Sequence, residues 1–242
     1  MRTANPALNR NTFAVRDTAG SGAGAMTIQG TVNKTGLLLV LTIAAAAYTW
    51  NTPRMALTLM PVGAIGGLIV AMITVFRKRS APVTAPMYAV LEGLFLGGIS
   101  VYFERAYPGI VSNAVFLTFG ILFALLFAYR TGLIKATENF KLGVAAATGG
   151  IFLVYMASFI LGFFGVRMPF LHSSGPLGIG ISLVIVVVAA LNLVLDFDFI
   201  EQGAEQGAPK FMEWYAAFGL LVTLIWLYLE ILRLLAKLQN RR

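Results

Sequence analysis

Seven long apolar segments dominate the sequence and limit what the chain can fold into. They are separated by short polar connections and cover residues 35–51, 55–76, 83–104, 110–129, 140–165, 177–200 and 211–236. A helix needs about 20 mainly apolar residues to cross the roughly 30 Å hydrocarbon core of a bilayer. An α-helix also satisfies its backbone hydrogen bonds within one segment, as lipid requires. The sequence therefore predicts an all-α polytopic membrane protein with a seven-transmembrane-helix bundle at 35–238.

The composition supports a membrane protein without catalytic chemistry. Only 12% of the residues are charged and 58% are hydrophobic, whereas soluble domains are about 25% charged. The chain has no cysteine and a single histidine, His172, which leaves no disulfide, no thiolate metal site and no histidine-built zinc site. There is also no nucleophile elbow, phosphate loop or His-Glu pair. We therefore expect no enzyme, no cofactor and no resident metal.

The basic residues predict the orientation of the chain. The formal charge of +8 sits in short runs beside the apolar segments, which is typical of topology signals and lipid headgroup contacts and not of nucleic-acid binding. Residues 1–34 are small, polar and basic, and we expect a flexible cytoplasmic tail there. With the N-terminus inside, eleven basic residues fall on the cytoplasmic side against seven outside. This places Arg77 to Arg79 in the cytoplasm, although the basic residues of 233–242 favour the opposite orientation.

Glycines cluster in three of the predicted spans. Helices associate in lipid through close packing, which small residues permit. We therefore expect tight helix contacts at Gly63, Gly66, Gly67, Gly93, Gly97, Gly98, Gly143, Gly149 and Gly150.

One carboxylate, Glu92, lies near the middle of the third span. A charged group deep in a bilayer is costly, so it normally faces a cavity or a partner and often marks an ion or proton path. We expect Glu92 to be enclosed by the bundle and not to face lipid. A structural hydrogen bond to a neighbouring helix is the alternative interpretation.

A second group of acidic residues closes the sixth span. Asn192 and Asp196 are four residues apart and share a helical face, whereas Asp198 points away by about 200°. Asp196 lies a turn or more inside the expected helix end, which favours a functional role. Glu201 and Glu205 mark the entry of the helix into water.

The last span carries acidic residues at both ends. Glu213 lies close to its beginning, and Glu230, Arg233 and Lys237 form a stripe near its far end. Residues three and four apart on a helix are neighbours, so local ion pairing explains this stripe.

Three segments make the chain similar to a known family. They are YAVLEGLFLG at 88–97, LVLDFDFIE at 193–201 and IWLYLEILRL at 225–234. With the seven-span layout, they resemble the Bax inhibitor-1 family of membrane proteins in its bacterial branch, over residues from about 30 to 238.

The resemblance implies a bundle whose last helix is central, in a bacterial inner membrane. It also implies a pH-sensitive calcium leak gated by aspartates on the sixth and seventh helices, with calcium as the permeant ion and not a cofactor. Asp196 matches the first aspartate. An ungapped match of the last helix places Thr223 at the second, whereas matching Tyr228-Leu-Glu230 instead makes Glu230 the partner.

Distance along the last helix weighs against Glu230 as that partner. At 1.5 Å per residue it lies ~28 Å from the beginning of the span, so it and Asp196 would sit near opposite membrane faces. Asp198 and Glu213 remain as substitutes because both lie near the inner end.

Two functions from different classes follow. The first is a calcium or cation leak, or a proton-coupled flux, controlled by buried carboxylates. The second is a non-conducting regulator that binds other membrane proteins, motivated by the unmatched second aspartate and the basic tail. The expected partners are the lipid bilayer, calcium or protons, and other membrane proteins. The candidate ion- or proton-binding residues are Asp196, Asp198, Glu92, Glu213 and Glu230.

Overall fold

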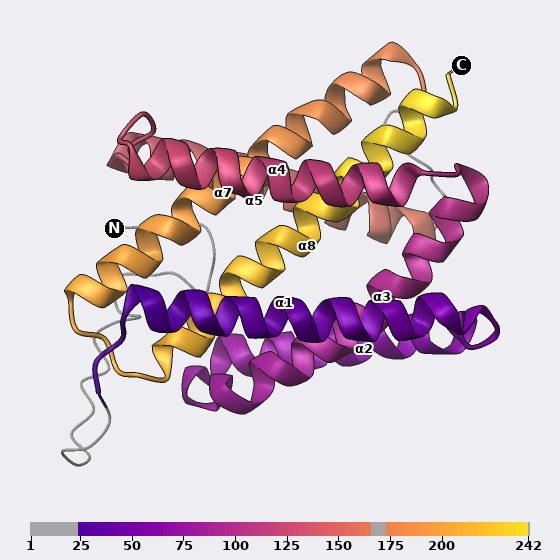
Figure 1. Cartoon of the computed structure of the whole chain (residues 1–242). Helices are drawn as coiled ribbons and strands as arrows, with labels where there is room; N and C mark the ends of the chain where they lie inside the picture. The colour runs from indigo at the N-terminus through magenta and orange to yellow at the C-terminus, as the bar shows by residue number, and fades with distance from the viewer. Residues whose placement is uncertain (1–23, 166–172, 242) are drawn as a thin grey trace. The chain divides into compact units, whose positions relative to one another are not determined.

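The computed structural model describes residues 24–165 and 173–241, and these are almost entirely helical (Figure 1). All seven long helices are long and apolar enough to cross a membrane. Within the described residues, the only pairing of extended backbone is one isolated bridge between Ala25 and Pro209. The predicted all-α fold with seven membrane-length helices is therefore confirmed. In chain order, the elements are α1 (Ile28–Asn51), α2 (Pro53–Phe76), η2 (Lys78–Ser80), α3 (Ala81–Ala106), α4 (Ile110–Arg130), α5 (Glu138–Phe163), α7 (Pro176–Glu205) and α8 (Met212–Gln239).

The first helix begins earlier than the sequence suggested, at Ile28 instead of residue 35. Thr27 caps it, because its side chain accepts a hydrogen bond from the Gly30 amide at 2.9 Å. The hydroxyls of Thr31 and Thr35 bond to backbone carbonyls one turn earlier, so these polar residues suit a helix. Of the predicted tail, residues 1–23 lie outside the described residues, as does His172.

The chain forms two compact units. The N-terminal unit contains α1, α2, α3 and residues 196–222, which are the last turns of α7 and the first part of α8. The C-terminal unit contains α4, α5, residues 176–195 of α7 and residues 223–239 of α8. The last two helices therefore contribute to both units.

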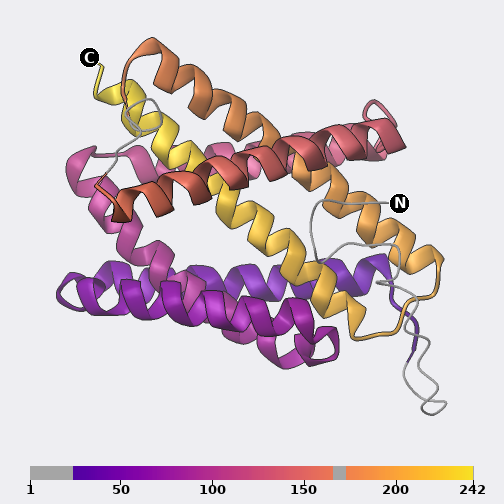
Figure 2. The ribbon, with the colours of Figure 1, turned by 180° about the vertical axis from the view of Figure 1, so that it is seen from behind.

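In the N-terminal unit, α3 packs along both α1 and α2 (Figures 1 and 2). Gly93 and Gly97 of α3 face α1 so closely that a Cβ on either would overlap the carbonyl oxygen of Thr42 or Ala46. This pair confirms the predicted close contact, because the neighbour is backbone and cannot move aside.

The contact between α2 and α3 also depends on glycine. A Cβ on Gly63 would lie 2.5 Å from the carbonyl oxygen of Leu91 and 2.7 Å from the amide of Phe95. Further along, the hydroxyls of Thr74 and Thr84 form a hydrogen bond of 2.8 Å between the two helices. The predicted close packing of the second and third spans is thus confirmed.

α4 and α5, the two spanning helices that lie wholly in the C-terminal unit, are mostly exposed. α4 buries a single narrow stripe, formed by Ile110, Ala114, Thr118 and Leu122. Only 11% of the most apolar window of α5 is buried. Gly143, Gly149 and Gly150 have nothing within 4 Å of where a Cβ would lie. The prediction of tight contacts at these three glycines is wrong among the described residues, because they lie on open sides of α5.

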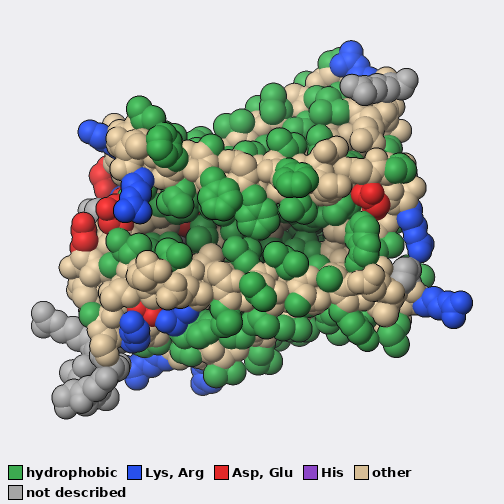
Figure 3. Space-filling view, in the orientation of Figure 1, with side chains coloured by type: hydrophobic (Ala, Val, Ile, Leu, Met, Phe, Trp, Pro, Cys, Tyr) green, Lys and Arg blue, Asp and Glu red, His purple; other side chains and the backbone are tan. Residues whose placement is uncertain are grey.

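The last helix is the most enclosed of the seven. In α8, 61% of the most apolar window is buried, and no other spanning helix exceeds 39%. This agrees with the expected central last helix. Over the face drawn in Figure 3, hydrophobic side chains cover the lengths of the helices, whereas charged side chains gather at helix ends. That distribution suits helices whose middle parts lie in hydrocarbon.

Candidate functional site

Asp196 is enclosed within α7. Its residue is 5% exposed, and it lies nine residues before the helix ends at Glu205. The preceding Leu193, Val194 and Leu195 and the following Phe197 are all buried. A carboxylate among apolar neighbours loses most of its hydration. The balance between its charged and neutral forms therefore depends on the polar groups, water or ions that come close to it. The helix continues to Glu205 and not only to the predicted residue 200, so Asp196 lies further from its end than the sequence indicated.

The neighbours of Asp196 on α7 take separate roles. The amide of Asn192 donates to the Thr148 hydroxyl of α5 at 2.8 Å and to the Val188 carbonyl. Asp198 is half-buried and accepts a hydrogen bond of 2.5 Å from Gln202. Asn192 therefore fastens α7 to α5, and Asp198 is bonded to a residue one turn later.

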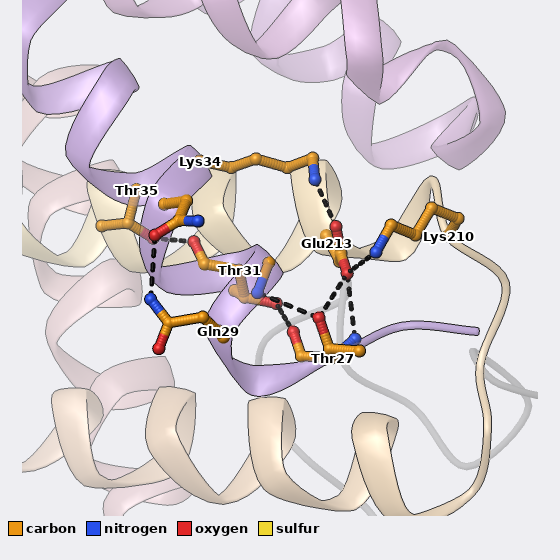
Figure 4. Close-up of polar contacts among 9 residues, drawn as sticks. Thr27, Gln29, Thr31, Lys34, Thr35, Lys210 and Glu213 are labelled. Carbon is orange, nitrogen blue, oxygen red and sulfur yellow. Dashed lines mark hydrogen bonds and ion pairs between the residues drawn. The ribbon is translucent and has the colours of Figure 1, made fainter. Parts of the chain in front are cut away.

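Glu213 is the centre of a dense polar cluster in the N-terminal unit (Figure 4). Its side chain is fully buried. One carboxylate oxygen accepts hydrogen bonds from the Thr27 amide and hydroxyl, both at 2.9 Å, and lies 2.7 Å from the Lys210 amine. The other oxygen pairs with the Lys34 amine. Charge-assisted bonds of this kind are the strong ones in proteins.

The surroundings of Glu213 leave room for this cluster. Gly30 of α1 packs directly on the carboxylate, and a Cβ there would overlap it. The Lys34 amine also lies 5.5 Å from the ring centre of Trp214. The Met26 amide donates to the Ala208 carbonyl at 2.7 Å beside the cluster. Glu213 therefore fastens the beginning of α1 to the beginning of α8.

Glu230 is the centre of a second polar cluster, in the C-terminal unit. It is 2% exposed and accepts hydrogen bonds from Tyr155 of α5 at 3.0 Å, from Trp226 at 3.3 Å and from Arg233 at 3.1 Å. The Tyr155 hydroxyl also bonds to Arg233. The predicted local ion pair between Glu230 and Arg233 is thus present, together with an aromatic partner from another helix.

Lys237, the last residue of the predicted stripe, reaches a different helix. It is buried, and its amine donates to the Gly178 carbonyl at 3.1 Å and to the Ser182 hydroxyl at 2.7 Å, both on α7. The stripe of Glu230, Arg233 and Lys237 therefore does more than form local ion pairs on the helix surface, because Lys237 also binds α7.

Glu213 and Glu230 belong to separate clusters on one helix. They are 17 residues apart on α8, which is ~26 Å at 1.5 Å per residue. Among the described residues, neither has a hydrogen bond or ion pair with another carboxylate.

Glu92 has the simplest surroundings of the predicted site residues. It is half-buried on α3, and a Cβ on Gly67 of α2 would lie 2.6 Å from its Oε1 atom. Within 24–165 and 173–241, its carboxylate makes no hydrogen bond or ion pair. The same described ranges contain no group of three or more His, Cys, Asp or Glu that could hold a metal ion.

A family model described as Bax inhibitor 1 like matches residues 5–240, nearly the whole chain. The chain belongs to the Bax inhibitor 1-like family. No curated protein and no solved structure gave a significant match. Together with its seven apolar helices, this membership makes the chain a multi-pass membrane protein.

Thr223, which the resemblance predicts to occupy the place of a second aspartate, is a neutral residue in this Bax inhibitor 1-like protein. Thr223 lies on α8 and is 7% exposed. A hydroxyl cannot share a carboxylate's proton at neutral pH. The acidic side chains of α8 are instead in two clusters, one at its beginning and one in its second half.

Sequence reasoning missed most partners of those clusters. Lys34 was assigned to a tail, and Tyr155 was not singled out among eight tyrosines. Lys34 and Glu213 are 179 residues apart, so no local pattern links them. The available signal in the sequence was a basic residue directly before the first apolar segment.

Proposed function

We propose that this protein is a pH-sensitive leak for cations, with calcium as the main permeant ion, controlled by buried carboxylates. The observation that carries the proposal is Asp196, a carboxylate with 5% exposure inside an apolar membrane-length helix. Ionisable residues at such positions are costly and commonly mark ion or proton paths. Membership of the Bax inhibitor 1-like family supports this assignment. The proposal gives the chain no catalytic step and no cofactor.

The other acidic residues receive different roles in this proposal. Glu213 and Glu230 each bind basic side chains, so they brace α8 at its beginning and in its second half. Asp196 is the group whose change of charge favours or opposes the conducting state. Water or a cation in an open pathway would favour its charged form.

The test is calcium flux into liposomes that contain only this protein, measured across pH. The wild type should carry flux that changes with pH. Asp196→Asn keeps the side-chain shape and removes the titration, so the pH dependence should flatten. Glu201→Gln is the matched control, because this exposed carboxylate lies on the last turns of the same helix. Unchanged pH dependence in Asp196→Asn would refute the role of Asp196.

The proposed orientation places the N-terminus and residues 77–79 on the cytoplasmic side of a bacterial inner membrane. Three consecutive basic residues between α2 and α3 support it, because such runs resist translocation. A reporter fused between α2 and α3 should give a cytoplasmic signal. An external signal there would reverse the topology.

A non-conducting regulator that binds other membrane proteins is the second candidate. The observation that favours it is α5, whose Gly143 and Gly150 are exposed and open to a close approach. In that case the purified wild type carries no calcium flux. A photo-crosslinker at position 150 should then capture another membrane protein in cells, and one at Tyr102, an exposed residue of α3, should not.

A further inference from the structure

Glu92 lies in a notch between α3 and α2. Its carboxylate occupies the space that a side chain at Gly67 would fill, since a Cβ there would lie 2.6 Å from Oε1 and 3.1 Å from the carboxyl carbon. Gly66, the adjacent residue of α2, faces only the flexible end of Leu91, at 3.1 Å. The absence of a side chain at Gly67 therefore gives the Glu92 carboxyl group its room.

The face of α3 that carries Glu92 points into the N-terminal unit. Ala85 and Ala89 on this face are fully buried, and Leu96, one turn later, is 8% exposed. Tyr88, one turn earlier, packs its ring edge-on against Phe218 of α8 with centroids 4.9 Å apart. Glu92 is thus a polar side chain on an apolar, inward-facing surface.

No charged residue lies close to Glu92 along the helices that form the notch. The charged residue of α2 is Arg54, 13 residues before Gly67, which is ~20 Å along the axis. On α3, Glu104 and Arg105 are 12 and 13 residues away, ~18 Å or more. The neighbouring titratable group is Tyr88.

The other helices of this unit also carry charged groups. On α1 and α8 these are Lys34 and Glu213, which pair with each other, and the hydroxyl of Tyr215 is also on α8. The segment of α7 in this unit carries Asp196, Asp198, Glu201 and Glu205.

We propose that Glu92 is a proton-binding site in the middle of the membrane-spanning part. A proton adds to the carboxylate to give a neutral carboxylic acid, and when water reaches the carboxyl group a water molecule accepts the proton as hydronium and leaves the carboxylate. A proton is the ligand because one carboxylate with an apolar lining supplies far fewer than the six to eight oxygens that calcium takes. The neutral acid also avoids the cost of an unpaired charge in hydrocarbon. The site does not depend on the protein being a calcium leak.

The experiment is pH-difference infrared spectroscopy of the full chain in lipid nanodiscs. The wild type should show a carbonyl stretch of a protonated carboxylic acid that shifts in heavy water. Glu92→Gln should lose this band, and Asp196→Asn should keep it. Retention of the whole band in Glu92→Gln would overturn the proposal, whatever the flux assay shows.

A matched pair of glycine variants keeps the test decisive if Glu92→Gln fails to fold. Gly67→Ala places a methyl group against the carboxyl, so the band should shift in frequency. Gly66→Ala meets only the movable Leu91 side chain and should leave the band at its wild-type position. Identical spectra for the two variants would place the proton on another group and refute the assignment.

Discussion

The N-terminal and C-terminal units contain similar glycine-rich apolar helices but pack them differently. In the N-terminal unit, Gly63, Gly93 and Gly97 meet the backbone of a neighbouring helix. In the C-terminal unit, Gly143 and Gly150 meet nothing within 4 Å. A cluster of glycines in a membrane helix therefore permits close approach but does not show that another helix of the same chain uses it.

The two units also hold their buried glutamates differently. Glu213 is bound by two lysines and the beginning of α1, so its partners are mostly charged. Glu230 is bound by one arginine and two aromatic side chains. The first cluster depends on charge, whereas the second can keep neutral hydrogen bonds when the charge is removed.

The largest effect should come from removing the charge of Glu213. Glu213→Gln leaves the half-buried Lys34 and the exposed Lys210 beside a neutral amide, which should cost about 3 kcal/mol of unfolding free energy, at the low end for a broken buried pair because both lysines keep some contact with solvent. Glu230→Gln should cost less, about 1–2 kcal/mol, because Tyr155 and Trp226 can still donate to the amide oxygen. Unfolding in detergent micelles measures both. Equal losses would contradict the distinction between the two clusters.

A smaller loss of stability should distinguish a glycine that contacts a neighbouring helix from a glycine that faces open space. Gly93→Ala forces a methyl group against the Thr42 carbonyl, and overpacking of this kind typically costs about 1–3 kcal/mol. Gly150→Ala enters open space on α5 and gains helix propensity, so stability should change by less than about 1 kcal/mol or increase slightly. Thermal unfolding of the two variants, compared with the wild type, tests this. A large loss in Gly150→Ala would reveal a packing partner for α5.

The smallest expected difference in unfolding free energy is between variants of two buried threonines, Thr74 and Thr118. The hydroxyls of Thr74 and Thr118 both bond to a carbonyl one turn earlier in their own helix, at 2.8 Å and 2.7 Å, but the Thr74 hydroxyl also bonds to the Thr84 hydroxyl of α3. Thr74→Val should therefore lose about 1 kcal/mol, and Thr118→Val less than about 0.5 kcal/mol. Chemical denaturation of both variants provides the measurement. If Thr118→Val costs as much as Thr74→Val, the hydrogen bond between helices contributes nothing.

The number of helices could be predicted from hydropathy, but their ends could not. The sequence predicts the first helix seven residues too late because Thr31 and Lys34 look like part of a polar tail, and Thr35 like its boundary. In the structure, the two hydroxyls bond to carbonyls of their own helix, and the lysine pairs with a glutamate. The polarity that suggested a loop is satisfied inside the helix, which a hydropathy average does not register.

The candidate residues could be named from the sequence, but their partners could not. A lone carboxylate in a span identified Glu92 and Asp196, because position along a helix is a local property. Which glycine faces Glu92, or which tyrosine reaches Glu230, depends on how helices rotate about their axes. Small differences in packing over whole helices decide that rotation, so single residues do not reveal it.

The bonds between Glu213 and the beginning of α1 also set an order of events during synthesis. Lys34 precedes Glu213 by 179 residues, and ribosomes add roughly 5–20 residues per second, so about 9–36 s pass before its carboxylate partner exists. During that interval the first helix lies in the insertion machinery or the bilayer, and the Lys34 amine near its beginning lacks the Glu213 carboxylate. Completion of the N-terminal unit therefore waits for the last helix, and a chain truncated before α8 should be recognised as unfinished by membrane proteases.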